Sequence, residues 1–402
     1  MSTLLIKNGR VLDPFSKKDG IADVYVSDGK IQRIEPSIST SADEVIDATG
    51  LVVTPGLVDI HVHLREPGRE DIETLETGSK AALAGDITAV AAMPNTNPVA
   101  DNHTVIEFVI NRARELGLIS IYPVGATTKR SEGDILSEMW EMKRSGAIGV
   151  TDDGADVGGE DLFLKAMEYA KTHDIIIFNH CEIDDLTDKG AMHEGWVSTE
   201  LGLPGIPEVA EDVAVHRSIL LARRSGARVH LSHLSTKGAM KALRDAKQSG
   251  LDNLTADTAV QYFSLTDDEC RGYNTSAKMY PPLRPREHVD AVIAAIKDGT
   301  FDALITDHAP HIEPDKIKPF VEAARGTVGL ETSFAAMNTY LVEAGHISLS
   351  EGIALMTHKP AAIIRKDKGT LAIGADADIA IFDTKKEWIV DPSKFYATFL
   401  YK

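Results

Sequence analysis

Short apolar segments alternate with helical segments through the middle of the chain, and this alternation restricts the fold more than any other feature. The eight predicted strands are Leu57–His63, Ile87–Met93, Ile119–Val124, Ala147–Thr151, Ile175–Asn179, Arg228–His233, Asn253–Thr258 and Ala303–Asp307. Helices predicted between them include Leu162–Thr172, Val209–Ser225, Lys237–Ser249 and His288–Lys297. Eight strand–helix alternations predict an α/β fold in which a parallel sheet closes into a (β/α)8 TIM barrel. A doubly wound open sheet is the alternative, but it more often has fewer strands and a glycine-rich turn after the first.

Both ends of the chain are rich in short predicted strands. These are Leu4–Ile6, Asp23–Val26 and Lys30–Ile34 near the N-terminus, and Asp378–Phe382 leading into Trp388–Val390 near the C-terminus. Turn signals such as Asn8-Gly9 and Asp28-Gly29 separate them. We therefore expect a small β-sandwich domain formed by both termini, residues 1–54 plus 359–402, beside a catalytic barrel of residues 55–358. A barrel of about 250 residues fits within the 402 available.

Two histidines stand at the end of the first predicted barrel strand. His61 and His63 are two residues apart, and strand side chains alternate between faces, so both project into the barrel. The carboxyl ends of barrel strands form the catalytic mouth in this fold. Two imidazoles so placed can hold one divalent metal, although an isolated pair is as often packed or solvated.

Other predicted strands also end in residues of metal-ligand type. Asp152-Asp153 follows the fourth strand, His180 the fifth, His233 the sixth and Asp307 the eighth. Imidazole and carboxylate groups suit Zn²⁺, and one carboxylate can bridge two ions. Asp307 is the best candidate for a second role, because a carboxylate beside a metal-activated water can move a proton to a leaving nitrogen. The alternation pattern leaves His230 as a structural residue.

Composition restricts the partners and the compartment. Asp and Glu outnumber Lys and Arg by 61 to 42, a formal net charge of -19, which argues against nucleic acid or anionic membrane as a partner. A local arginine can still hold a small anionic substrate. The two cysteines, Cys181 and Cys270, favour a reducing compartment, and we expect a cytoplasmic protein with a small-molecule substrate. No apolar run reaches the roughly 20 residues of a membrane span.

Five motifs together resemble one known family. They are His61-Val62-His63-Leu64-Arg65-Glu66-Pro67-Gly68, Met93-Pro94-Asn95-Thr96, Asn179-His180-Cys181-Glu182, Ser232-His233-Leu234-Ser235 and Thr306-Asp307-His308-Ala309-Pro310-His311. Leu203–Pro207 and Val328–Thr332 fit the same pattern. Nearly the whole chain thus resembles the class I dihydroorotases of the amidohydrolase superfamily.

The resemblance implies a role for each site residue. It implies zinc, one or two ions per chain, on His61, His63, His180, His233 and Asp307, with Asp153 bridging if there are two. Related hydantoinases and allantoinases bridge with a carboxylated lysine, but the nearest upstream lysine here is Lys143. Asp307 would also be the general base. Arg65, Asn95 and His311 would hold the carboxylate of dihydroorotate, for which a planar arginine fork is well shaped.

The chain departs from the family pattern at three places. Tyr280 stands before Pro281-Pro282-Leu283-Arg284, where the family usually has an asparagine that contacts the substrate, so we expect Tyr280 among the substrate-binding residues. Val260-Gln261-Tyr262 replaces the usual Pro-His-His. The sequence stops at Phe399–Lys402, where relatives continue for a further strand or so.

Three functional hypotheses stay open at this point. The first is a dihydroorotase that interconverts N-carbamoyl-L-aspartate and (S)-dihydroorotate in de novo pyrimidine biosynthesis. The second, favoured by Tyr280, is a hydrolase of another cyclic amide or lactone. The third is a weakly active homologue that supports aspartate carbamoyltransferase, and in each case a homo-oligomer is expected. The intact ligand set favours an enzyme.

Overall fold

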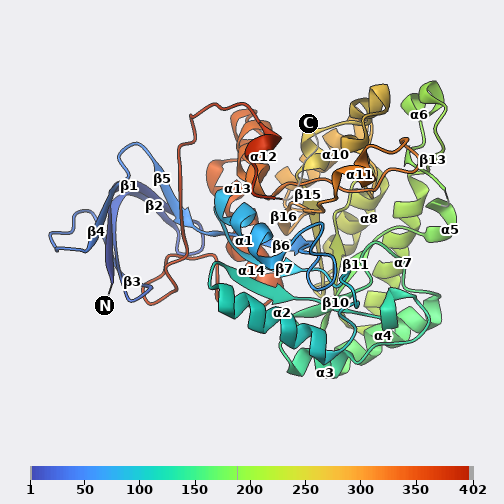
Figure 1. The fold of residues 1–402 in the computed structure, drawn as a ribbon, viewed down its shortest axis with the longest axis horizontal. Helices are drawn as coiled ribbons and strands as arrows, with labels where there is room; N and C mark the ends of the chain where they lie inside the picture. Colours follow the sequence, from blue (N-terminus) through green and yellow to red (C-terminus); the bar gives the residue numbers. More distant parts are fainter. Residues whose placement is uncertain (1, 188, 398–402) are drawn as a thin grey trace.

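Eight parallel strands form a closed ring in the computed structural model, which describes residues 2–187 and 189–397 (Figure 1). They are β6 (Leu57–Val62), β7 (Ile87–Ala92), β8 (Ser120–Pro123) with its short continuation β9 (Gly125–Ala126), β10 (Gly149–Thr151), β11 (Ile176–His180), β14 (Arg228–Ser232), β15 (Leu254–Ala259) and β16 (Ala303–Ile305). Neighbouring strands pair in this order. The ring closes where Val62 pairs in parallel with His308, and the His63 amide donates to the His308 carbonyl at 2.8 Å. Each predicted barrel strand overlaps one of these, and closure excludes the open sheet.

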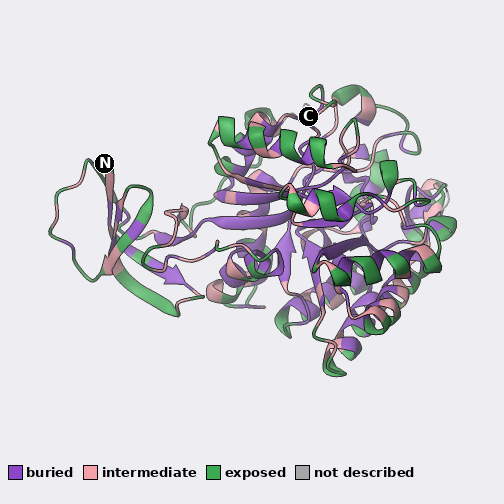
Figure 2. Ribbon diagram, turned by 90° about the horizontal axis from the view of Figure 1, so that it is seen from below, coloured by how far each residue is buried: buried purple, intermediate pink, exposed green. Residues whose placement is uncertain are grey.

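Helices surround the ring and bury one face each against it. Among them are α1 (Leu75–Ala84), α2 (His103–Leu116), α3 (Met139–Arg144), α4 (Glu160–Thr172), α7 (Val209–Ser225), α8 (Lys237–Gln248), α10 (Arg286–Lys297) and α14 (His358–Ile363). In α4 the buried residues Phe163, Ala166, Met167 and Ala170 follow the 3.6-residue period of one helix face. Figure 2 shows the barrel strands almost entirely buried and the outer helix faces exposed. No helix of the described residues is long and apolar enough to cross a membrane.

Strands from both ends of the chain share a second, mixed sheet. It contains β1 (Thr3–Asp13), β2 (Lys18–Ser27), β3 (Lys30–Glu35), β4 (Glu44–Asp47), β5 (Val52–Pro55) and β17 (Ile379–Phe382). β17 runs antiparallel to β5, so the C-terminal strand joins the N-terminal sheet, which lies at one side of the barrel in Figure 1. The predicted fold class is confirmed, while the domain boundaries near residues 54 and 359 stay a prediction. The predicted chain end, Phe399–Lys402, lies outside the described residues.

The predicted strand at Trp388–Val390 is wrong. This segment has irregular backbone, and Ile389 is 91% exposed. Trp388 and Val390 instead line a surface cavity of about 580 Å³ beside α12 (Ser333–Met337). Residues 388–390 pair with no strand of the described sheet. A strand without hydrogen bonds to a neighbouring strand is not stable, because its backbone groups have no partner.

Candidate metal centre

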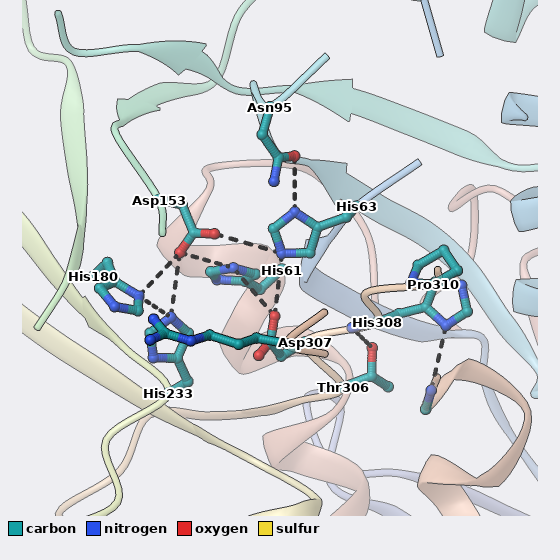
Figure 3. A network of polar contacts seen from close by, with 12 residues as sticks. His61, His63, Asn95, Asp153, His180, His233, Thr306, Asp307, His308 and Pro310 are labelled. Carbon is teal, nitrogen blue, oxygen red and sulfur yellow. Dashed lines mark hydrogen bonds and ion pairs between the residues drawn. The ribbon is translucent and has the colours of Figure 1, made fainter. Parts of the chain in front are cut away.

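Six side chains of metal-ligand type meet at the carboxyl ends of the barrel strands (Figure 3). They are His61 in β6, His63 directly after it, Asp153 after β10, His180 at the end of β11, His233 after β14 and Asp307 after β16. Five of them are buried, and the Asp153 side chain is only 6% exposed. The barrel therefore gathers at one point the residues that the sequence places far apart.

One group of ligand atoms comes from the two strands where the ring closes. Asp307 Oδ1 lies 3.2 Å from His63 Nε2 and 3.7 Å from His61 Nε2. Although burial raises the pKa of Asp307, the hydrogen bond with His63 and the charge of His61 hold it below its usual value. Asp307 is therefore a carboxylate at neutral pH, as a ligand or a base requires.

Asp153 lies between this group and the remaining two histidines. Its Oδ1 is 3.2 Å from His61 Nε2, 3.3 Å from His233 Nε2 and 3.7 Å from His180 Nδ1. Its Oδ2 is 3.5 Å from His63 Nε2. Burial raises the pKa of Asp153, but the surrounding histidines outweigh it and hold that pKa well below the usual range. One ionised carboxylate thus faces four imidazoles, which is the arrangement that a bridge between two cations needs.

His61 tests whether these residues fit a metal. Its Nε2 lies 3.2 Å from Asp153 Oδ1, but the approach is not that of a hydrogen bond, and neither buried ring nitrogen makes one within the described part of the chain. Buried polar atoms nearly always have a partner. A divalent cation among His61, Asp153 and Asp307 would give Nε2 one, and nitrogen with carboxylate oxygen is a donor set typical of zinc.

Two of the candidate ligands, His63 and His233, are held by a second polar group. Asn95 Oδ1 accepts a hydrogen bond from His63 Nδ1 at 2.9 Å, which fixes the ring with Nε2 facing the site (Figure 3). Asp257 accepts from the backbone amide of His233 at 2.5 Å and from His230 Nε2 at 2.8 Å. His230 therefore has the structural role that the alternation pattern predicts. The sequence analysis missed Asp257, for which the available signal was a charged residue inside a buried strand.

Arg65 is the cation nearest this centre among the residues predicted to contact substrate. Its Nη2 donates to the Pro310 carbonyl at 3.3 Å. Within residues 2–187 and 189–397, Arg65 forms no ion pair with a carboxylate, and its buried Nε has no partner. Burial lowers the pKa of Arg65 to about 10, so the guanidinium stays charged at neutral pH.

The other two side chains predicted to contact the substrate carboxylate, Asn95 and His311, already make hydrogen bonds within the protein. Asn95 uses its oxygen on His63, so only its amide nitrogen remains to donate. His311 Nε2 donates to the Arg325 carbonyl at 2.6 Å. Burial and the charge of Arg65 lower the pKa of His311 to about 3, so Nδ1 of the neutral ring can only accept. His311 has to turn or gain a proton before it can donate to a carboxylate.

Tyr280 lies against the metal-ligand group. Its ring centre is 4.7 Å from that of His180, and its hydroxyl donates to Thr187 Oγ1 at 3.2 Å. The Arg325 guanidinium lies over the ring, 4.2 Å from its centre. Tyr280 therefore occupies space beside His180.

Comparisons with known proteins find relatives of the whole chain. Residues 50–239 match a family model described as dihydro-orotase-like, and residues 190–399 match that of the amidohydrolase family. A dihydroorotase of Ruminiclostridium cellulolyticum is 46% identical over 98% of this chain and 91% of its own length. One of Syntrophus aciditrophicus is 47% identical over 98% of this chain and 92% of its own. Among solved structures, the L-hydantoinase (dihydropyrimidinase) of Arthrobacter aurescens superposes with a TM-score of 0.87 at 26% identity, covering 100% of this chain and 91% of its own.

Proposed function

The chain belongs to the dihydroorotase family of amidohydrolases and is a hydrolase that acts on cyclic amides, and from that membership we propose that it is a class I, zinc-dependent dihydroorotase. The reaction we assign to it is the interconversion of N-carbamoyl-L-aspartate and (S)-dihydroorotate. We further propose that it works in the cytoplasm as a homo-oligomer, with aspartate carbamoyltransferase as a partner; co-elution of the two purified proteins tests this last point.

Zinc is the cofactor that the donor set supports. We place one ion on His61, His63 and Asp307 and a second on His180 and His233, with Asp153 as the shared ligand. When bound, such an ion polarises the amide carbonyl and makes a coordinated water acidic.

Asp307 is the residue that moves the proton. Its buried carboxylate can accept a proton from the attacking water and deliver it to the ring nitrogen as the C–N bond breaks. In the reverse direction it removes a proton from the carbamoyl nitrogen before the ring closes. The His63 contact at 3.2 Å holds the carboxylate in position for both transfers.

The assignment of dihydroorotate as the substrate depends on Arg65. Dihydroorotate has a carboxylate that plain hydantoins and dihydropyrimidines lack, and a partly buried guanidinium without a carboxylate partner among the described residues suits such an anion. The protein has a formal net charge of -19, so Arg65 provides a local positive charge within an acidic protein.

One experiment tests the assignment against its alternative. The alternative is hydrolysis of a cyclic amide without the carboxylate, which Tyr280 favours because its ring fills space beside His180. Spectrophotometric assays on metal-quantified protein should compare dihydroorotate with hydantoin and dihydrouracil, in wild type and Arg65→Met. We expect dihydroorotate to be preferred and Arg65→Met to remove that preference. Faster turnover of hydantoin by the wild type would contradict the proposal.

A further inference from the structure

A buried carboxylate stands behind one of the candidate zinc ligands. Glu182 is fully buried, and its Oε2 lies 3.5 Å from Nε2 of His180, two residues earlier. This nitrogen faces away from the site, since Nδ1 of the same ring is the atom 3.7 Å from Asp153. Neither carboxylate oxygen of Glu182 makes a hydrogen bond to the described residues, so both can still accept one.

Arg284 ties Glu182 to a second buried carboxylate. Arg284 is 2% exposed, and its Nη2 lies 3.2 Å from Glu211 Oε2 and 3.7 Å from Glu182 Oε1. Its Nε donates to Ser235 Oγ at 3.0 Å. Glu211 accepts from the backbone amides of Ser235 and Thr236 at 2.7 and 2.8 Å. One end of this network therefore lies at His180, and the other holds the loop directly after His233.

Stability alone does not account for these three buried charges. Removing ions from water is costly, and well-packed apolar residues of similar volume are often as stabilising as a buried ion pair. A histidine that ligates a metal usually donates its other ring N–H to a carboxylate, which fixes the tautomer and the ring plane. Glu182 is placed to accept such a bond from Nε2, leaving the Nδ1 lone pair toward Asp153.

We infer that Glu182, held by Arg284 against Glu211, is a positioning residue for the zinc position formed by His180 and His233. The inference rests on the proposed metal centre and deepens it. Arg284 also belongs to the loop that carries Tyr280, whose ring centre lies 4.7 Å from that of His180. The same network thus contacts the ring of His180 through Glu182 and holds the loop whose Tyr280 packs against that ring.

Glu182→Gln is the variant that tests the inference. It leaves Arg284 paired with Glu211 at 3.2 Å, so no buried charge loses its last partner and the protein should fold. Loss of such an outer carboxylate typically weakens metal binding by about 10- to 100-fold. We expect this loss for one zinc only, while the zinc on His61, His63 and Asp307 is retained. The measurement is zinc stoichiometry by mass spectrometry across buffered free-zinc concentrations, with circular dichroism to check folding.

Glu73→Gln is the matched control. Glu73 is equally buried and lies 3.5 Å from His308 Nε2, but His308 is not a candidate ligand. This variant should keep wild-type affinity at the His180–His233 position. Glu182→Asp keeps the charge and withdraws the carboxylate, and it should show the same selective loss if the amide variant does not fold.

The outcomes separate this inference from the proposed function. Wild-type protein that binds no zinc overturns the metal centre itself. Wild-type protein that binds zinc with an affinity unchanged by Glu182→Gln or Glu182→Asp overturns only the role of Glu182. Equal weakening of both zinc positions, or of the Glu73→Gln control, shows a general structural effect and also overturns it.

Discussion

Three residues of the candidate site adopt a backbone conformation that side chains with a Cβ rarely take. Arg65, His233 and Asp307 have φ angles of 62°, 43° and 50°, each directly beyond or close to the end of a barrel strand. The left-handed region costs a residue other than glycine of order 1–3 kcal/mol. The surrounding barrel must offset that cost, which makes these positions typical of a functional site.

Asp307→Asn separates proton transfer from metal binding. The amide keeps the shape and one oxygen for His63, but it cannot take a proton from water. We expect turnover of dihydroorotate to fall by at least ~10²–10⁴-fold, the usual contribution of a general base. Zinc analysis should show that at least one ion remains. A variant that keeps more than about a tenth of the wild-type rate would show that another group is the base.

Tyr280→Asn tests whether the aromatic ring limits the reaction. The ring lies against His180 and its hydroxyl is engaged by Thr187, so it occupies space without offering a free donor. An asparagine removes the ring and restores an amide donor, and a new hydrogen bond to substrate is worth ~1–3 kcal/mol. We expect kcat/KM for dihydroorotate to rise about ten- to hundredfold. Steady-state kinetics at matched zinc content is the measurement.

Tyr273→Asn is the control for that substitution. Tyr273 is 53% exposed, and its hydroxyl donates to the Leu201 carbonyl away from the metal-ligand group. It should leave kcat/KM unchanged. An ordinary wild-type rate that Tyr280→Asn does not improve would mean that the ring leaves room for substrate.

At the scale of elements, local pattern predicted the barrel but not every strand of the terminal sheet. Barrel strands are buried on both faces, so they appear as apolar runs between helices, and even the three-residue β10 was found. β4 was missed because its residues are largely exposed and carry no apolar alternation. Trp388–Val390 has an apolar run but no partner strand in the described sheet. Strand pairing is a non-local property, and a local pattern does not contain it.

The candidate ligands could be predicted and their supporting residues could not. His61, His180 and Asp307 stand at strand ends, and the fold itself makes those positions meet. Glu182, Glu211 and Arg284 meet through contacts spanning up to 102 positions of sequence, from residue 182 to residue 284. Glu182 and Arg284 lie in segments that the family resemblance singles out, but no local pattern shows that they contact each other or Glu211.

The segment after β16 contains a buried lysine that makes stability depend on pH. Lys316, at the end of α11 (Glu313–Lys316), donates from Nζ to the carbonyls of Thr275 and Ala324, both at 3.0 Å. Burial and the charge of Lys278 lower the pKa of Lys316 to about 7, from 10.5 in an exposed lysine. Between these values the unfolded chain binds a proton that the folded protein does not, so this group makes stability rise with pH.

Lys316→Met should remove that rise. The variant keeps most of the buried alkyl chain but cannot titrate. Denaturant unfolding of both proteins at pH 6.5, 8 and 9.5 measures the effect, and the stability difference between wild type and variant should shift in favour of the wild type as pH increases. A difference that stays constant over this window would mean that Lys316 is charged in the folded protein throughout.

At the scale of the whole molecule, the candidate zinc ligands bring together the carboxyl ends of five barrel strands that lie far apart in the sequence. They come from β6, β10, β11, β14 and β16 or the residues directly after them, and span positions 61 to 307. A cation bound there would contact the first and last barrel strands at the point where the ring closes. Metal binding should therefore stabilise the closed ring as a unit.

Zinc content and thermal stability together test this coupling. Protein purified without chelator should carry one to two zinc ions per chain. Because zinc binds the assembled site and not the unfolded chain, zinc at about 1,000 times its dissociation constant adds ~4 kcal/mol to the free energy of unfolding. For 402 residues this corresponds to about 5 °C in Tm, and removal of zinc by a chelator should lower Tm by that order. Calorimetry of loaded and stripped protein measures the shift, and a His61→Asn/His63→Asn variant, which lacks two of the ligands, should show a smaller one. Protein that takes up no zinc even after reconstitution, or whose Tm does not respond to it, would rule out a metal that connects these strands.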